Sequence, residues 1–170
     1  MSAALTSLQK HGNVVLIDIL LLTSLYLLPS FSHVTALPLY MLEPMRVALI
    51  IALLFTNRAN TYLLAFTIPL ASSMITGHPI LFKAVLMGIE LTILVASYGY
   101  LVRFDRIPAF LALTAGIVIG KLVYYSMKFT ALGAGLLTGS LVSTPWQNQL
   151  VLAVGTAGVF GVVEHFRAKK

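Results

Sequence analysis

Residues 80–102 read ILFKAVLMGIELTILVASYGYLV, and this stretch decides the class of fold. Lys83 and Glu90 are its charged side chains, and the other residues are apolar, small or weakly polar. A helix needs roughly 20 mainly apolar residues to cross the hydrocarbon core of a bilayer. The stretch therefore predicts a membrane-spanning helix, because a helix satisfies its own backbone hydrogen bonds where water is absent.

The composition extends this interpretation to the whole chain. Of the 170 residues, 59% are hydrophobic and 9% are charged, and the mean hydropathy is +0.96. Soluble domains carry about 25% charged residues, so this chain has too few charges to cover a water-exposed surface. It has no cysteine, which excludes disulfides, thiolate metal sites and thiol catalysis. We expect an all-α integral membrane protein with a single domain over residues 1–170.

Five further apolar runs are separated by proline, glycine and polar residues. They lie at residues 14–31, 45–56, 61–76, 109–130 and 146–166. Together with residues 80–102 they predict a bundle of about six transmembrane helices. The runs at 45–56 and 61–76 are short, and as a re-entrant pair they would reduce the number of crossings to about four.

The basic residues predict the orientation in the membrane. Six crossings place both termini on one side, and that side carries the larger group: Lys10, Arg58, Arg103, Arg106, Arg167, Lys169 and Lys170. The other side holds Arg46, Lys83 and Lys128. Because basic residues concentrate in the cytoplasm, we expect both termini there, in a multi-pass protein of a bacterial or archaeal cytoplasmic membrane. The longer connections at 32–44 and 132–145 then face outside. The net charge of +6 follows from this topology and does not indicate a nucleic-acid partner.

Ionisable residues inside the predicted helices indicate where a site would lie, because such residues are costly in a bilayer. Glu90 falls near the middle of its helix, and Lys83 lies two turns earlier on nearly the same face. Lys121 begins a polar stripe that continues through Tyr124 or Tyr125 to Lys128. We expect a pocket that opens to the outside between the last three helices and is lined by His78, Lys83, Glu90, Lys121, Tyr124, Tyr125, Trp146, Gln147 and Asn148.

Two other interpretations of these residues stay open. Glu90 and Lys121 would also serve as a buried ion pair that locks two helices, with the tyrosines and Trp146 at the membrane interface. A proton or ion path is the third alternative. Glu43 and Arg46 are three residues apart, which predicts a local salt bridge or, alternatively, an arginine contact to a ligand carboxylate or phosphate.

Small residues recur every four positions on several predicted helices. Examples are Gly116 with Gly120, Ala48 with Ala52, and the set Ala153, Ala157 and Gly161. Such faces let two helices approach closely. Packing within the chain is the simpler use, and docking onto a partner helix is the alternative.

Sequence signatures of enzymes are missing. The chain has no HExxH, no Gly-x-Ser-x-Gly and no P-loop. We therefore expect no enzyme activity, no cofactor and no metal site, and any energy for transport must come from a partner that hydrolyses ATP.

The layout resembles the substrate-binding S component of energy-coupling factor (ECF) transporters, which are small, basic, six-helix proteins with cytoplasmic termini. The local match is Met45-Arg46-Val47-Ala48-Leu49-Ile50-Ile51-Ala52. The resemblance implies uptake of a small, vitamin-like organic molecule that is polar or anionic and binds near the outer face. It also implies surrounding membrane lipid, a partner membrane subunit with an ATPase, and docking through Ala48 and Ala52. The rival class is a non-transporting scaffold of the MreD type, which would need small-residue faces but no polar pocket.

Overall fold

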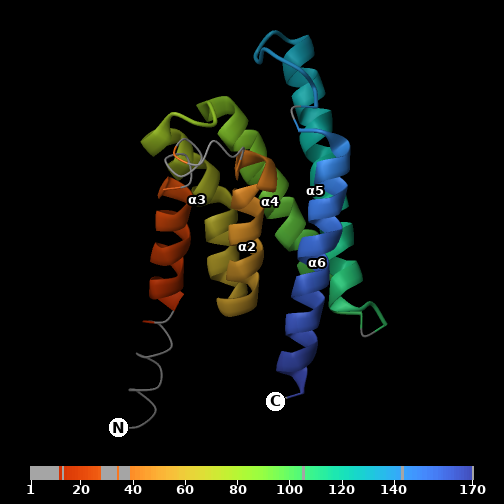
Figure 1. Ribbon diagram of the computed structural model, residues 1–170. Coiled ribbons are helices and arrows are strands. Elements are labelled where there is room, and N and C mark those ends of the chain that lie inside the picture. Colours follow the sequence, from red (N-terminus) through yellow and green to blue (C-terminus); the bar gives the residue numbers. More distant parts are fainter. Residues whose placement is uncertain are drawn as a thin grey trace.

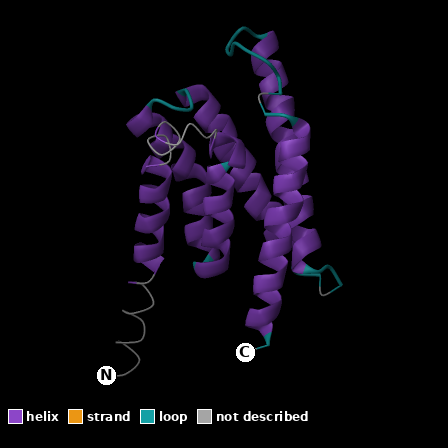
Figure 2. Cartoon of the chain, in the orientation of Figure 1, coloured by secondary structure: helices purple, strands orange, loops and turns teal. Residues whose placement is uncertain are grey.

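The computed structural model describes residues 14–27, 39–104, 106–142 and 144–169, together with residues 12 and 34. All regular structure in this part of the chain is helical, and no strand occurs in it (Figure 2). The helices are Val14–Leu27, the short 3₁₀ helix η1 (Leu39–Leu42), α2 (Pro44–Phe55), α3 (Arg58–Thr76), α4 (Leu81–Leu101), α5 (Ala109–Gly133) and α6 (Trp146–Ala168). The expectation of an all-α protein is confirmed for the described residues.

Three of the described helices are long and apolar enough to cross a bilayer, namely α4, α5 and α6. The Val14–Leu27 helix and α2 are apolar but shorter. The 12 residues of α2 rise only about 18 Å at 1.5 Å per residue, whereas the hydrocarbon core is about 30 Å thick. The helices are those of a membrane protein, and a crossing by each of the six predicted segments stays a prediction.

The helix ends lie close to where the sequence predicts them. Gly77 ends α3 in the left-handed conformation with φ 71°, and its N–H donates to the carbonyl of Ser73. Glycine adopts this conformation without steric cost. At the other end of α3, Asn57 Oδ1 accepts a hydrogen bond from the N–H of Asn60 at 2.9 Å. Pro44 stands in the first turn of α2, where a missing N–H costs nothing.

Glycine allows a close approach between α4 and α5. A Cβ at Gly116 would lie 2.9 Å from the carbonyl oxygen of Leu94, and one at Gly120 would lie 2.9 Å from that of Glu90. Similarly, a Cβ at Gly161 of α6 would lie 2.9 Å from Phe110 Cβ on α5. The small-residue faces of α5 and α6 are therefore used for packing within the chain, the simpler of the two predicted uses.

The core contains the small residues of α2 as well. Ala48 is 5% exposed and Ala52 is fully buried, and both belong to the main apolar cluster with residues of α3, α4 and α6. Docking onto a partner through these two residues would require the α2 packing to open. The structure therefore offers no exposed small-residue surface at Ala48 and Ala52.

The helix bundle has two distinct ends (Figure 1). The end that we call the C-terminal end holds the α2–α3 turn, the α4–α5 connection and Lys169. The opposite end, which we call the pocket end, holds η1, the turn at residues 77–80 and the α5–α6 connection. α5 reaches furthest at the pocket end, and the connection returns from it to the start of α6.

Candidate functional site

A cavity of about 640 Å³ lies at the pocket end, between the start of α2, the end of α3, α4, α5 and the start of α6. Six of the nine predicted ligand-binding residues line it: His78, Lys83, Glu90, Lys121, Tyr124 and Tyr125. A volume of this size matches the 300–1,000 Å³ typical of small-molecule sites. The structure thus brings the predicted polar residues of α4 and α5 to one place.

Four charged side chains form a compact cluster on the wall of this cavity, and we call Glu43, Arg46, Glu90 and Lys121 the charge quartet. Arg46 Nη2 donates to Glu90 Oε1 at 2.7 Å, and Arg46 Nη1 contacts Glu43 Oε2. Lys121 Nζ donates to Glu43 Oε1 at 2.8 Å and lies 3.4 Å from Glu90 Oε1. The two acids and two bases balance in charge, as buried ions require.

The backbone at Glu43 holds one member of the quartet in place. Glu43 has φ 47° and ψ 55°, the left-handed conformation, directly before α2. This conformation costs a non-glycine residue about 1–2 kcal/mol. The carboxylate gains contacts to Arg46 and Lys121 and lies at a helix N-terminus, where the helix dipole favours negative charge. The quartet thereby ties the start of α2 to α4 and α5.

Aromatic side chains of α5 form the next part of the wall. Lys121 Nζ lies 5.6 Å from the ring centroid of Tyr124 and 5.7 Å from that of Tyr125, within the range of cation–π attraction. The hydroxyl of Tyr125 donates to Gln149 Oε1 at 2.8 Å, and Gln149 Nε2 donates to the carbonyl of Thr144 at 2.7 Å. Gln149 and Thr144 both line the cavity.

The contribution of α6 differs from the predicted one. Trp146 is 62% exposed, and Gln147 and Asn148 are exposed as well. None of the three lines the cavity, and Asn148 Nδ2 instead lies 3.9 Å from Met41 Sδ of η1. α6 begins at Trp146. Its side chain that lines the cavity is Gln149, which lies nearly one helical turn later.

A second group of basic residues lines the same cavity without belonging to the quartet, and we call His78, Lys83 and Lys128 the basic wall. All three line both the main cavity and a second cavity of about 350 Å³, which also contacts residues 137–140. Lys128 is only 4% exposed and donates to the carbonyl of Leu141 at 2.8 Å. The α5–α6 connection therefore packs against the pocket, in line with the predicted cover by residues 132–145. The other predicted cover is residues 32–44. The structure describes residue 34 and residues 39–44 of it, and the rest lies outside the described residues.

Sequence reasoning separated residues that the structure joins. Glu43 and Arg46 were predicted as a local pair or a ligand contact, and Glu90 and Lys121 as a second pair, yet all four are one cluster. The number of acidic residues in the sequence could have indicated this shared cluster. The chain has only five acidic residues, so a buried Glu90 with two basic candidates on neighbouring segments implies sharing. Gln149 and Thr144 carried no comparable signal.

No metal site accompanies the cavity within the ranges that the structure describes, because no three histidines or carboxylates come together there. The arrangement is instead that of a binding site with apolar, aromatic and charged walls. Comparison with protein-family models, with curated proteins and with solved structures finds no match for this chain. The structure is that of a helical protein with three described helices that could cross a membrane and, at one end, a cavity with apolar, aromatic and charged walls.

Proposed function

We propose that this chain is a membrane-embedded subunit that binds a small organic molecule from the outer face and passes it to a partner membrane subunit driven by an ATPase. This is the role of the S components of ECF transporters, which the layout of the chain resembles. In this proposal both termini are cytoplasmic, the pocket end faces outside, and the chain crosses the membrane about six times.

The observation that carries the proposal is the cavity of about 640 Å³ with a buried charge quartet on its wall. A protein that serves only as a membrane anchor has no need of a polar cavity, because burying ions costs free energy.

A scaffold of the MreD type is the second candidate, and one observation favours it. The quartet is balanced in charge and joins α2, α4 and α5 without any ligand. A purely structural quartet would lock the helices together and leave the cavity to water or lipid. The two candidates differ in whether a specific molecule occupies the cavity.

Native mass spectrometry of the purified full chain tests the proposal. We expect a small molecule to co-purify with the wild type and to be lost from the variant Tyr125→Leu, which removes a cavity wall and the hydrogen bond to Gln149. The variant Tyr100→Leu is the matched control, because Tyr100 is exposed near the C-terminal end of α4. Retention of the molecule by both variants, or no bound molecule and no ligand-dependent rise in melting temperature across a metabolite panel, would favour the scaffold.

A further inference from the structure

The charges that line the main cavity do not balance. Four basic residues line it, Arg46, Lys83, Lys121 and Lys128, against two carboxylates, Glu43 and Glu90. Both carboxylates contact Arg46 and Lys121 within the charge quartet. The quartet is thus neutral as a unit, and Lys83 adds a positive charge outside it, while Lys128 donates to the carbonyl of Leu141.

Two of the remaining acids pair elsewhere. The sequence has five acidic residues. Asp18 Oδ1 accepts a hydrogen bond from Asn60 at 2.9 Å, and Glu164 pairs with Arg167 at 3.3 Å, both toward the C-terminal end. Asp105 lies outside the described residues. Among the residues that the structure describes, no carboxylate forms an ion pair with Lys83.

Lys83 and His78 are the accessible members of the basic wall. Lys83 is half-buried on the first turn of α4, two helical turns before Glu90, and His78 is exposed. Lys128 is 4% exposed. All three side chains line both cavities.

The rest of the main cavity is largely apolar. Leu25, Met45, Met87 and Leu91 line it beside the rings of Tyr124 and Tyr125. Methionine side chains adapt to irregular apolar shapes. An apolar body would therefore be accommodated between the quartet and the basic wall.

We propose that the basic wall binds the anionic group of an amphipathic ligand, a carboxylate or phosphate, while the apolar part of that ligand lies against Met45, Met87 and Leu91. This inference rests on the proposed function and specifies the ligand class of the same site. The shared chemistry, one anionic group on an apolar body, has two possible sources: a soluble organic acid and an anionic lipid. Arg46 and Lys121 do not bind this anion, because the quartet already neutralises them.

Three compounds with the same apolar body and different charge test the inference. They are 4-phenylbutyrate (anionic), 4-phenylbutanamide (neutral) and 4-phenylbutylamine (cationic), added to the full chain in nanodiscs of phosphatidylcholine. Binding is measured by ligand-observed NMR. We expect the carboxylate to bind at least about tenfold more tightly than the amide, a difference of about 1.4 kcal/mol. The amine should bind most weakly.

The variant Lys83→Met should lose this preference and bind the carboxylate about as weakly as the amide. Lys83→Arg should retain the preference, because it keeps the charge. Lys169→Met is the control at the exposed C-terminal end of α6. Since Lys83 is only half-buried, these variants are expected to fold, and unchanged melting temperatures would verify it.

A second set of nanodiscs that contain phosphatidylglycerol distinguishes the two sources. Phosphatidylglycerol that displaces 4-phenylbutyrate from the wild type, and is retained in native mass spectra by the wild type but not by Lys83→Met, would support the inference with a lipid as ligand. Carboxylate binding unaffected by phosphatidylglycerol would support it with a soluble acid.

Two results would overturn the inference, and they differ in what they imply for the proposed function. Equal binding of all three compounds, or a preference that survives in Lys83→Met, would reject the anion site and leave a small-molecule pocket in place. Failure of every compound and of the anionic lipid to bind, together with no co-purified molecule, would reject the proposed function as well.

Discussion

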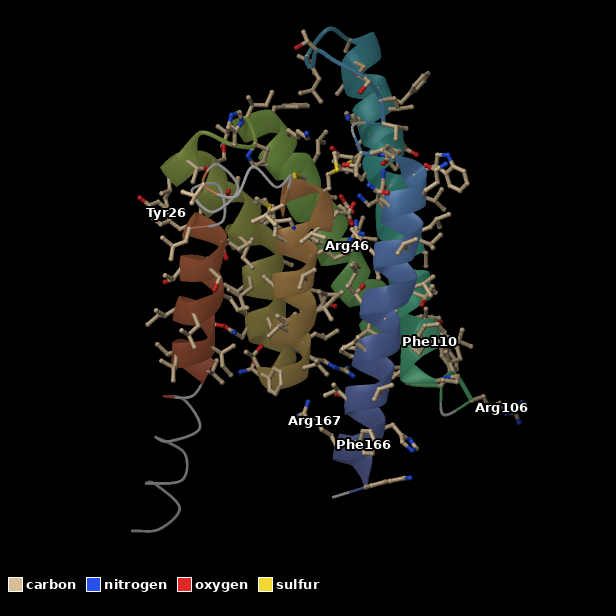
Figure 3. The ribbon with its side chains drawn as sticks, viewed as in Figure 1. Tyr26, Arg46, Arg106, Phe110, Phe166 and Arg167 are labelled. Atoms are coloured by element: carbon tan, nitrogen blue, oxygen red, sulfur yellow. The ribbon has the colours of Figure 1, made fainter. Side chains whose placement is uncertain are left out.

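The two ends of the helix bundle use the same basic residue types in opposite ways. At the C-terminal end, Arg103 and Arg106 are exposed, and Arg167 is exposed with Glu164 as a neighbour (Figure 3). At the pocket end, Arg46 is 5% exposed and sits among the helices. Exposed basic residues set orientation at little cost in stability, whereas buried ones require carboxylates or a ligand. The degree of burial, and not the residue type, therefore distinguishes the arginines that would set membrane orientation from the arginine on the cavity wall.

The largest expected effect is the loss of Arg46. The variant Arg46→Met leaves Glu43 and Glu90 with Lys121 as their remaining cation in the quartet. Breaking a buried ion cluster by removing one partner costs about 3–5 kcal/mol. Arg103→Met at the C-terminal end is the control and should change stability by less than about 0.5 kcal/mol. Unfolding curves in detergent measure both, and equal effects would contradict the distinction between the two ends.

A double variant that removes one acid and one base should destabilise the chain by less than the sum of the two single variants. Glu90→Gln with Arg46→Met removes one acid and one base, and Glu43 and Lys121 remain as a neutral pair. We expect the double variant to be more stable than Arg46→Met alone by about 1–3 kcal/mol, the usual size of coupling between contacting residues. A double-mutant cycle gives this number directly. Simple additivity of the two single effects would argue against a shared charge cluster.

The glycine contact between α4 and α5 positions Glu90, and a methyl group should disturb it. Gly120→Ala places a Cβ 2.9 Å from the carbonyl oxygen of Glu90, and overpacking of this kind costs about 1–3 kcal/mol. Gly155→Ala on α6 is the matched control, because nothing lies within 4 Å of its Cβ position. Alanine favours a helix over glycine by about 1 kcal/mol, so the control should be neutral or stabilising. Melting temperatures that fall equally would refute the close approach.

The smallest expected effect concerns which face of α6 points into the cavity. Gln149→Leu removes the acceptor of the Tyr125 hydroxyl and should destabilise the chain by about 1 kcal/mol. Gln147→Leu should have little effect because Gln147 is exposed. Thermal unfolding of both variants compares the two positions. A larger effect at Gln147 would restore the predicted assignment of the site to residues 146–148.

The elements of the bundle follow from the sequence because hydrophobic run length is a direct physical signal. The break at Gly77 and the start of α2 at Pro44 were predictable from backbone preferences, because glycine adopts the left-handed conformation without steric cost and proline suits the first turn of a helix. The short α2 marks the limit of this reasoning. Its 12 residues are apolar, but length alone does not say whether such a helix crosses a bilayer.

The sequence predicts a site residue only where burying its side chain in a membrane costs much free energy. Glu90 and Lys121 stand out because an ionisable residue in an apolar run needs a reason, and their neighbours Tyr124 and Tyr125 followed from helical spacing. The rotation of α6 was not predictable, because Gln147 and Asn148 are as polar as Gln149 is. The contact of Arg46 with Glu90 joins residues 44 positions apart, which no local pattern encodes.

The sidedness of the pocket is the central claim, and cysteine labelling tests it most directly, because the chain has no native cysteine. Thr144→Cys introduces a thiol on the cavity wall, and Arg103→Cys introduces one at the C-terminal end. Membrane-impermeant methanethiosulfonates of opposite charge are added to oriented membranes. We predict that Cys at position 144 reacts from the outer face, several-fold faster with the anionic sulfonatoethyl reagent than with the cationic trimethylammonioethyl reagent, and that Cys at position 103 reacts from the cytoplasm. Labelling of position 144 only from the cytoplasm, or faster with the cationic reagent, would contradict the account.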